Sequence, residues 1–137
     1  MIALDTGFLY ALVDADDAWH GRAMAMRHSA EQGWITTWPV LTEACRLMGD
    51  RLGADFPAAL MQDVAEGNLS IWSPPRDAVA QVPALLQRYA NLPMDLADAS
   101  LVLLAEHLGH GQILSTDERD FNAYRWKQHK PFHNLLA

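Results

Sequence analysis

The chain has 137 residues, half of them apolar, with 17 acidic and 10 basic side chains and a formal net charge of -7. This length suits one domain, residues 1–137, whose core can fold without disulfides. The single cysteine, Cys45, excludes a disulfide framework and a thiolate-rich zinc site. The first ten residues have no basic segment, and Asp5 interrupts their apolar run. We therefore expect a cytoplasmic protein without a signal peptide or membrane anchor.

Hydrophobic spacing predicts strands that alternate with helices. In chain order, these are a strand at 2–4, helical segments at 8–13 and 18–32, a strand at 34–37, helices at 39–51 and 55–66, a strand at 69–72, a helical region at 76–90, a helix at 94–108, and strands at 112–116 and 132–135. Pro83 should split the region at 76–90 into a helical pair. This alternation predicts an α/β fold with a mostly parallel sheet that is covered on both faces.

Two aspartates directly follow predicted strands. Asp5 ends the first strand, and Asp117 follows the strand at 112–116. Because ligands of such sheets bind outside the carboxyl ends of the strands, we expect these two carboxylates to share a site. The structural alternatives are a helix cap for Asp5 and a solvated turn for Asp117.

Further acids lie on predicted helices. Glu43 falls on the apolar face of its helix, where a carboxylate needs a partner, either a shared site or Arg46 three residues on. Asp95 and Asp98 begin the helix at 94–108, where capping explains one of them easily. The sequence leaves open which of these two would bind a metal directly.

Carboxylates that converge from separate elements are the natural ligands of Mg²⁺ or Mn²⁺. Two of them about 5 Å apart repel by roughly 3 kcal/mol at an effective dielectric near 20, so a cluster favours a bound cation or a raised pKa. We predict Asp5, Glu43, Asp98 and Asp117 as catalytic metal ligands. The candidates for a supporting role behind them are Thr6, Asp95, Thr116 and Asp120.

These segments resemble the PIN-domain family, named after the PilT N-terminus, and within it the VapC-type toxin ribonucleases of bacterial VapBC toxin–antitoxin pairs. The likeness covers nearly the whole chain. Four motifs carry it in order, at 4–20 with Asp5, 41–49 with Glu43, 94–106 with Asp98 and 113–121 with Asp117, and residues 130–136 are similar to the closing strand. Gly7 stands where many members carry serine or asparagine.

The resemblance implies a three-layer α/β/α domain with a central, roughly five-stranded parallel sheet. It also implies a Mg²⁺- or Mn²⁺-dependent endoribonuclease that acts on RNA, is inhibited by a small cognate antitoxin and forms a homodimer. Two alternatives remain on the sequence. One is a catalytically inert PIN-fold binding module, and the other is a phosphoryl-transfer domain on a similar parallel sheet.

The net charge of -7 argues against RNA binding, unless bound cations neutralise the acids. Four basic residues, Arg119, Arg125, Lys127 and Lys130, form a local strip in the last part of the chain. Trp126 lies among them, where it would either stack on RNA or join the core. The other four tryptophans belong to apolar patterns and are expected in the core: Trp19, Trp34, Trp38 and Trp72.

Overall fold

A five-stranded parallel sheet forms the centre of the computed structural model, which describes residues 1–137. Its strands are β1 (Ile2–Leu4), β2 (Trp34–Thr37), β3 (Ser70–Trp72), β4 (Gln112–Leu114) and β7 (His133–Asn134). They lie in the order β3-β2-β1-β4-β7, and each neighbouring pair is parallel. The chain adds β2 and β3 on one side of β1 and then β4 and β7 on the other, so the strand order reverses between β1 and β4. Ligand sites of open α/β sheets lie at such a point.

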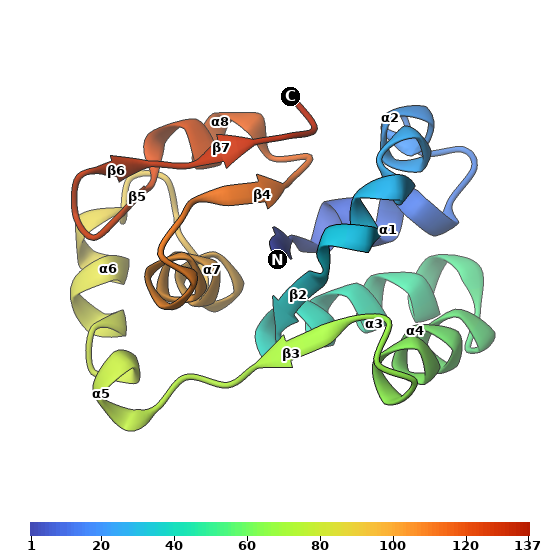
Figure 1. Cartoon of the computed structure of the whole chain (residues 1–137), viewed down its shortest axis with the longest axis horizontal. Helices are drawn as coiled ribbons and strands as arrows, with labels where there is room; N and C mark the ends of the chain where they lie inside the picture. Colours follow the sequence, from blue (N-terminus) through green and yellow to red (C-terminus); the bar gives the residue numbers. More distant parts are fainter.

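Helices cover both faces of the sheet. They are α1 (Thr6–Val13), α2 (His20–Ala25), the 3₁₀ helix η1 (Arg27–Gln32), α3 (Trp38–Leu52), α4 (Asp55–Ala65), α5 (Arg76–Val79), α6 (Val82–Arg88), α7 (Leu96–Leu108) and α8 (Glu118–Ala123). In Figure 1, α1, α3 and α4 lie on one side of the strands and α5, α6 and α7 on the other. This arrangement confirms the predicted three-layer α/β/α class.

The core fills the space between these layers. Strand β1 is buried on both faces, as its unbroken apolar sequence requires in a parallel sheet. Helix α7 is buried from Ala99 to Ala105 and packs against β1 and β2, so it is a central helix and not an amphipathic surface helix. No helix is both long and apolar enough to span a bilayer.

Most predicted elements are confirmed to within a few residues, but the single helix at 18–32 is wrong. The chain forms α2 and η1 instead, which meet at Met26. The Met26 carbonyl accepts hydrogen bonds from the backbone N–H and the hydroxyl of Ser29, at 2.9 and 2.6 Å. Both bonds span three residues, which favours the tighter 3₁₀ geometry.

The helical pair at 76–90 is confirmed, but the break lies before Pro83 and not at it. Helix α5 ends at Val79, and α6 begins at Val82, so Pro83 lies in the first turn of α6. A proline is tolerated there because the N–H that it lacks would have no partner within the helix.

Helix α8 and a small antiparallel hairpin were not predicted. The hairpin consists of β5 (Arg125–Trp126) and β6 (Lys130–Pro131). Its turn residues Lys127 and Gln128 have positive φ values of 48° and 68°. Neither residue is a usual signal for such a turn, which normally contains glycine or asparagine.

The structure decides between the two positions considered for Trp126 and contradicts the expectation for Trp38. Trp126 is only 6% exposed, and its indole N–H donates to the Pro131 carbonyl at 3.0 Å, so the suggestion that it stacks on RNA is wrong. Trp38, expected in the core, is 51% exposed at the start of α3. Val40 and Leu41 are buried, so the buried face of α3 begins after Trp38.

Candidate active site

Asp5 ends β1 and caps α1. One carboxylate oxygen, Oδ1, accepts the backbone N–H of Phe8 at 2.8 Å, so the capping role considered from the sequence is real. The other oxygen, Oδ2, accepts a short hydrogen bond from the Ser115 hydroxyl. Asp5 is only 7% exposed, although it remains at the wall of a cavity. A buried carboxylate held at both oxygens is fixed in position.

Ser115 is a member of the site that sequence reasoning missed. It directly follows β4 and is fully buried. Its hydroxyl oxygen donates to Asp5 and accepts the backbone N–H of Asp117 at 2.9 Å. One serine therefore joins the acids that follow β1 and β4. Its position two residues before Asp117 was the available signal, but serine is common after strands and carries no charge.

Asp117 caps α8, the short helix that the sequence did not reveal. Its Oδ1 accepts the backbone N–H of Asp120 at 3.1 Å. The side chain of Asp120 is buried and receives Arg119 Nε at 3.2 Å. The acidic run is therefore a helix start and not a solvated turn, and both aspartates face the same cavity.

The structure gives Asp95 and Asp98 different surroundings. Asp95 is exposed and caps α7, with Oδ1 accepting the backbone N–H of Asp98 at 2.8 Å. Asp98 is half-buried, and its Oδ2 accepts the phenol O–H of Tyr124 at 3.0 Å. Tyr124 was not predicted as a site residue. It is a buried aromatic residue that packs against Tyr89 and Phe121, and such a residue is hard to tell from core in a sequence.

Glu43 projects from α3 and is half-buried. The alternative pairing with Arg46 is wrong, because Arg46 reaches Asp50 at 4.0 Å instead. Gly7 lies against Thr116, whose Oγ1 would be 1.8 Å from a β-carbon at position 7. The hydroxyl of Thr116 thus fills the space that a larger residue at position 7 would need.

One cavity of about 360 Å³ joins these residues, and we call it the acid cavity. It lies at the carboxyl ends of β1 and β4, where α1, α7 and α8 begin. All eight predicted residues line it: Asp5, Thr6, Glu43, Asp95, Asp98, Thr116, Asp117 and Asp120. Arg119 is the one basic side chain in its wall.

The acid cavity raises the pKa of three carboxyls. Burial raises the pKa of Asp5 from 3.8 to about 6, against the opposing effect of its hydrogen bond from Ser115. Burial and then the charge of Asp95 raise the pKa of Asp98 to about 7. The pKa of Asp117 is raised by burial and by its contact with Asp120. Carboxyls with raised pKa values gain most from a cation.

The donor set is suited to a hard divalent cation, since it consists of carboxylates and hydroxyls without thiolates or imidazoles. No group of three or more His, Cys, Asp or Glu side chains is close enough together to form a metal-binding cage. Mg²⁺ does not require such a cage, because it usually keeps several waters and binds through one or two carboxylates. The residues therefore fit a hydrated Mg²⁺ or Mn²⁺ better than a fully protein-coordinated ion.

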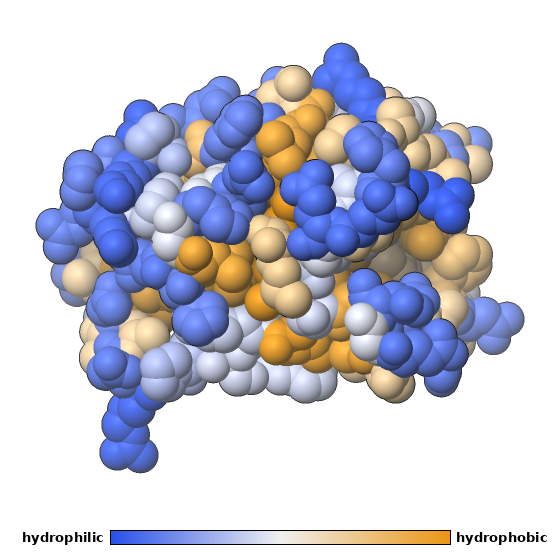
Figure 2. All heavy atoms as spheres, viewed as in Figure 1, coloured by the Kyte–Doolittle hydropathy of each residue, from blue (hydrophilic) through white to orange (hydrophobic).

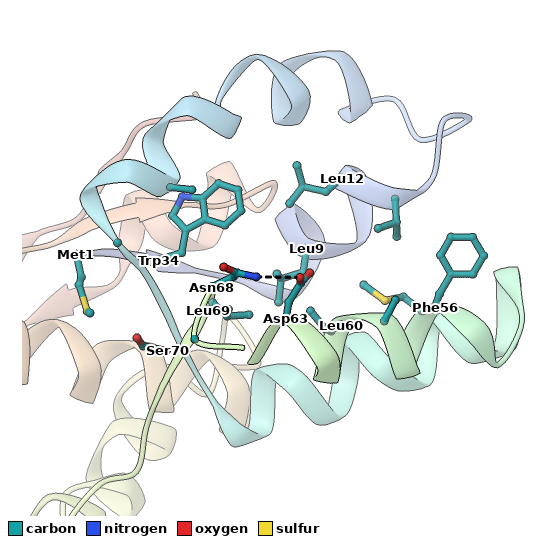
Figure 3. A pocket seen from close by; sticks show the side chains of 16 residues that line it. Met1, Leu9, Leu12, Trp34, Phe56, Leu60, Asp63, Asn68, Leu69 and Ser70 are labelled. Carbon is teal, nitrogen blue, oxygen red and sulfur yellow. Dashed lines mark hydrogen bonds between the residues drawn. The ribbon is translucent and has the colours of Figure 1, made fainter. Parts of the chain in front are cut away.

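A larger cavity of about 550 Å³ opens elsewhere, and we call it the apolar cleft. Figure 3 shows Leu9 and Leu12 of α1 facing Leu60 and Phe56 of α4 across it, with Trp34 above. Met1, Gly33 and Leu69, which also line it, precede or begin β1, β2 and β3. Figure 2 shows a hollow bordered by apolar residues between α1 and α4. None of the eight predicted residues lines this cleft.

Comparison with known proteins gives two informative similarities. Ribonuclease VapC26 of Mycobacterium tuberculosis is 26% identical over 122 residues, which cover 89% of this chain and 90% of the relative. The crystal structure of Mycobacterium tuberculosis VapC20, described as a sarcin-ricin loop cleaving toxin, superposes with a TM-score of 0.79 at 24% identity. The superposition covers 87% of this chain and 92% of VapC20. No family model matches the chain. The sequence motifs, the alignment and the fold agree in relating this chain to the VapC-type PIN-domain proteins.

Proposed function

We propose that this protein is a metal-dependent endoribonuclease and the toxin of a type II toxin–antitoxin pair. The observation that carries the proposal is the convergence of Asp5, Glu43, Asp98 and Asp117 in one cavity. The similarity to Ribonuclease VapC26 over nine-tenths of both chains supports it. The phosphoryl-transfer alternative receives no comparable support, because β3 ends without an acid at the same edge of the sheet.

In this proposal, the carboxylates would hold Mg²⁺ or Mn²⁺, and the ion would lower the pKa of a bound water and neutralise charge on the phosphate. One oxygen of Asp98 accepts from Tyr124 and one oxygen of Asp117 accepts from the Asp120 N–H, and both carboxylates would contribute ligands to the ion. Asp5 is fixed by its hydrogen bonds from Ser115 and from the N-terminus of α1, and its oxygens would keep further lone pairs for the ion. No nucleophilic side chain is required, because a water would form the new bond to phosphorus while the bond to the leaving oxygen breaks, and the proton lost by the water balances the one that the leaving oxygen takes up.

Arg119 would contact RNA phosphate at the mouth of the acid cavity. Its side chain is 79% exposed, and its Nε donates to Asp120 Oδ1 at 3.2 Å. The basic strip expected from the sequence contributes less, since Lys127 and Lys130 lie over the ring of Trp126 in the hairpin. The charge that offsets the protein's -7 is therefore proposed to come mainly from the bound cations.

The experiment incubates purified protein with a mixed RNA pool in Mg²⁺, in Mn²⁺ and in EDTA. We expect cleavage with either metal and none in EDTA. Asp5→Asn should abolish cleavage while keeping the fold, because asparagine also caps helices well. Cleavage that survives both EDTA and Asp5→Asn contradicts the mechanism. A folded wild-type protein that never cleaves RNA favours the inert binding module.

The partners follow from the same proposal. We propose a cytoplasmic homodimer that a small cognate antitoxin inhibits. Trp38 and Leu96, which are 51% and 59% exposed, line a shallow depression beside Glu43, and their exposure supports a dimer that covers them. Expression alone should arrest growth, and co-expression of a small neighbouring gene should relieve the arrest. Harmless expression would contradict the toxin assignment but not the nuclease.

A further inference from the structure

Asn134 lies in the last strand, outside the acid cavity, yet its side chain is bonded to the segment that organises the cavity. Its Oδ1 accepts the backbone N–H of Ser115 at 3.1 Å, and its Nδ2 donates to the Ser115 carbonyl at 2.9 Å. Oδ1 also accepts the backbone N–H of Leu136 at 3.1 Å. The reversed amide would point Nδ2 at two N–H donors, so these three bonds are compatible with one orientation only.

This amide takes the place of a backbone pairing. Strands β4 and β7 pair through His133 N to Gly111 O at 2.7 Å and Leu135 N to Ile113 O at 2.8 Å. A regular parallel ladder would continue to Ser115 through backbone groups further along β7. The side chain of Asn134 supplies both the acceptor and the donor for Ser115 instead. The end of β4 is thus held in an extended position although the regular pairing has stopped.

Ser115 passes this constraint to the acids. Its hydroxyl donates to Asp5 and accepts from the backbone N–H of Asp117, so a shift of Ser115 moves both carboxylates. Ser115 is fully buried, so water does not replace these partners. Through Ser115, the side chain of Asn134 in β7 is therefore connected to Asp5 after β1 and to Asp117 after β4.

We infer that Asn134 is a positioning residue that sets the separation of the Asp5 and Asp117 carboxylates for the bound metal. This inference rests on the proposed metal-dependent function, and it adds a residue that does not line the acid cavity. Outer residues that orient metal ligands typically change metal affinity or activity by about 10–100-fold when they are replaced.

The test measures Mn²⁺ affinity by electron paramagnetic resonance and RNA cleavage by steady-state kinetics, using the full chain. Asn134→Ala should weaken Mn²⁺ binding by about tenfold and lower kcat with little change in KM. Asn134→Asp keeps the acceptor for the Ser115 N–H but places a carboxylate oxygen against the Ser115 carbonyl, so it should also weaken Mn²⁺ binding. Asn68→Ala is the matched control, since Asn68 is an asparagine of the apolar cleft that bonds only to Asp63 and Glu66.

Ile113→Val distinguishes a positioning role of Asn134 from a purely structural one. It is a core substitution in β4 that leaves every side-chain hydrogen bond in place. Asn134→Ala should weaken Mn²⁺ binding more than Ile113→Val does at an equal loss of Tm. Unchanged Mn²⁺ affinity in Asn134→Ala, or an equal loss in Ile113→Val, overturns the inference. Mn²⁺ binding that depends on Asn134 in a protein without RNA cleavage supports the inference and contradicts only the nuclease. A wild-type protein that binds no Mn²⁺ contradicts both.

Discussion

The acid cavity and the apolar cleft lie at opposite ends of the strands of the same sheet. The acid cavity collects residues at the carboxyl ends of β1 and β4, whereas the apolar cleft is lined by residues at the amino ends of β1, β2 and β3 together with α1 and α4. Six carboxylates line the first and one, Asp63, lines the second. The comparison shows that a parallel sheet brings its strand-end acids together at one edge and leaves the other edge to hydrophobic packing.

Replacing one acid in each cavity should give the largest contrast. Asp98→Asn removes a proposed metal ligand, and we expect RNA cleavage to fall by about 100-fold or more, which corresponds to about 3 kcal/mol of lost transition-state stabilisation. Asp63→Asn makes the same chemical change in the apolar cleft and should leave cleavage unchanged. Single-turnover cleavage of a defined RNA measures both. Equal losses would contradict the separation of the two regions.

The acid cavity should also make stability depend on pH. Burial raises the pKa of Asp5 from 3.8 to about 6, so the folded state keeps this proton where the unfolded chain has lost it. Without metal, stability should therefore fall as pH rises from about 4 to about 6, and the loss should persist above that pH. At 1.36 kcal/mol per pKa unit, the effect of Asp5 is about 3 kcal/mol.

The measurement is urea unfolding in EDTA across this pH range. Asp5→Asn removes the titrating group. The free energy of unfolding of this variant, relative to that of the wild type, should therefore rise by about 3 kcal/mol between pH 4 and pH 7. Mn²⁺ should restore the wild type at pH 7, since it binds the ionised carboxylates. A constant difference between the two proteins across the range would contradict the burial of the Asp5 charge.

A substitution in the apolar cleft should affect stability alone. Leu60 is 9% exposed and lines the cleft from α4. Leu60→Ala should lower the free energy of unfolding by about 2 kcal/mol, at the low end for buried leucines, because the cleft already borders the side chain. Cleavage per folded molecule should not change. A drop in kcat at full folding would show that the cleft and the acid cavity are coupled.

The smallest expected effect comes from Tyr124→Phe, which removes the buried hydroxyl that bonds to Asp98. The phenol donates to Asp98 at 3.0 Å, and burial together with the Asp98 charge raises its pKa, so it stays a donor at neutral pH. We expect about a tenfold loss of kcat and an unchanged fold. Phe121→Leu, a nearby aromatic substitution without a polar atom, is the control. No loss of activity would mean that α7 alone positions Asp98.

The acids of the site were predictable because the hydrophobic spacing of the sequence shows where the strands end and which helical faces are apolar. Asp5 follows a strand of three apolar residues, and Glu43 lies in an apolar helical face, so topology alone brings them to one edge. Ser115 and Asn134 were not predictable, since their roles depend on hydrogen bonds between segments 19 residues apart and to Asp5, 110 residues away. Local sequence patterns do not reveal contacts between residues that are so far apart in the chain.

The errors in the fold arose where local signals were weak or misleading. Helix α8 has six residues and no apolar repeat, and its start depends on the Asp117 cap, which reads as part of an acidic loop. Trp126 lies among basic residues in sequence, but the hairpin turns its ring into the core. The apolar cleft draws on α1, η1, α3 and α4 at once, and a single sequence does not show which helical faces remain uncovered.

Three aspartates at the acid cavity, Asp5, Asp95 and Asp117, also begin helices, and each accepts the N–H of the residue three positions on. Asparagine caps a helix about as well as aspartate does. An aspartate codon becomes an asparagine codon through a single base transition. If the proposed activity harms its host, a folded but inactive protein therefore lies one mutation away at Asp5 or Asp117. Among cells that survive forced expression, Asp→Asn changes at these positions should therefore be frequent, alongside mutations that truncate the protein.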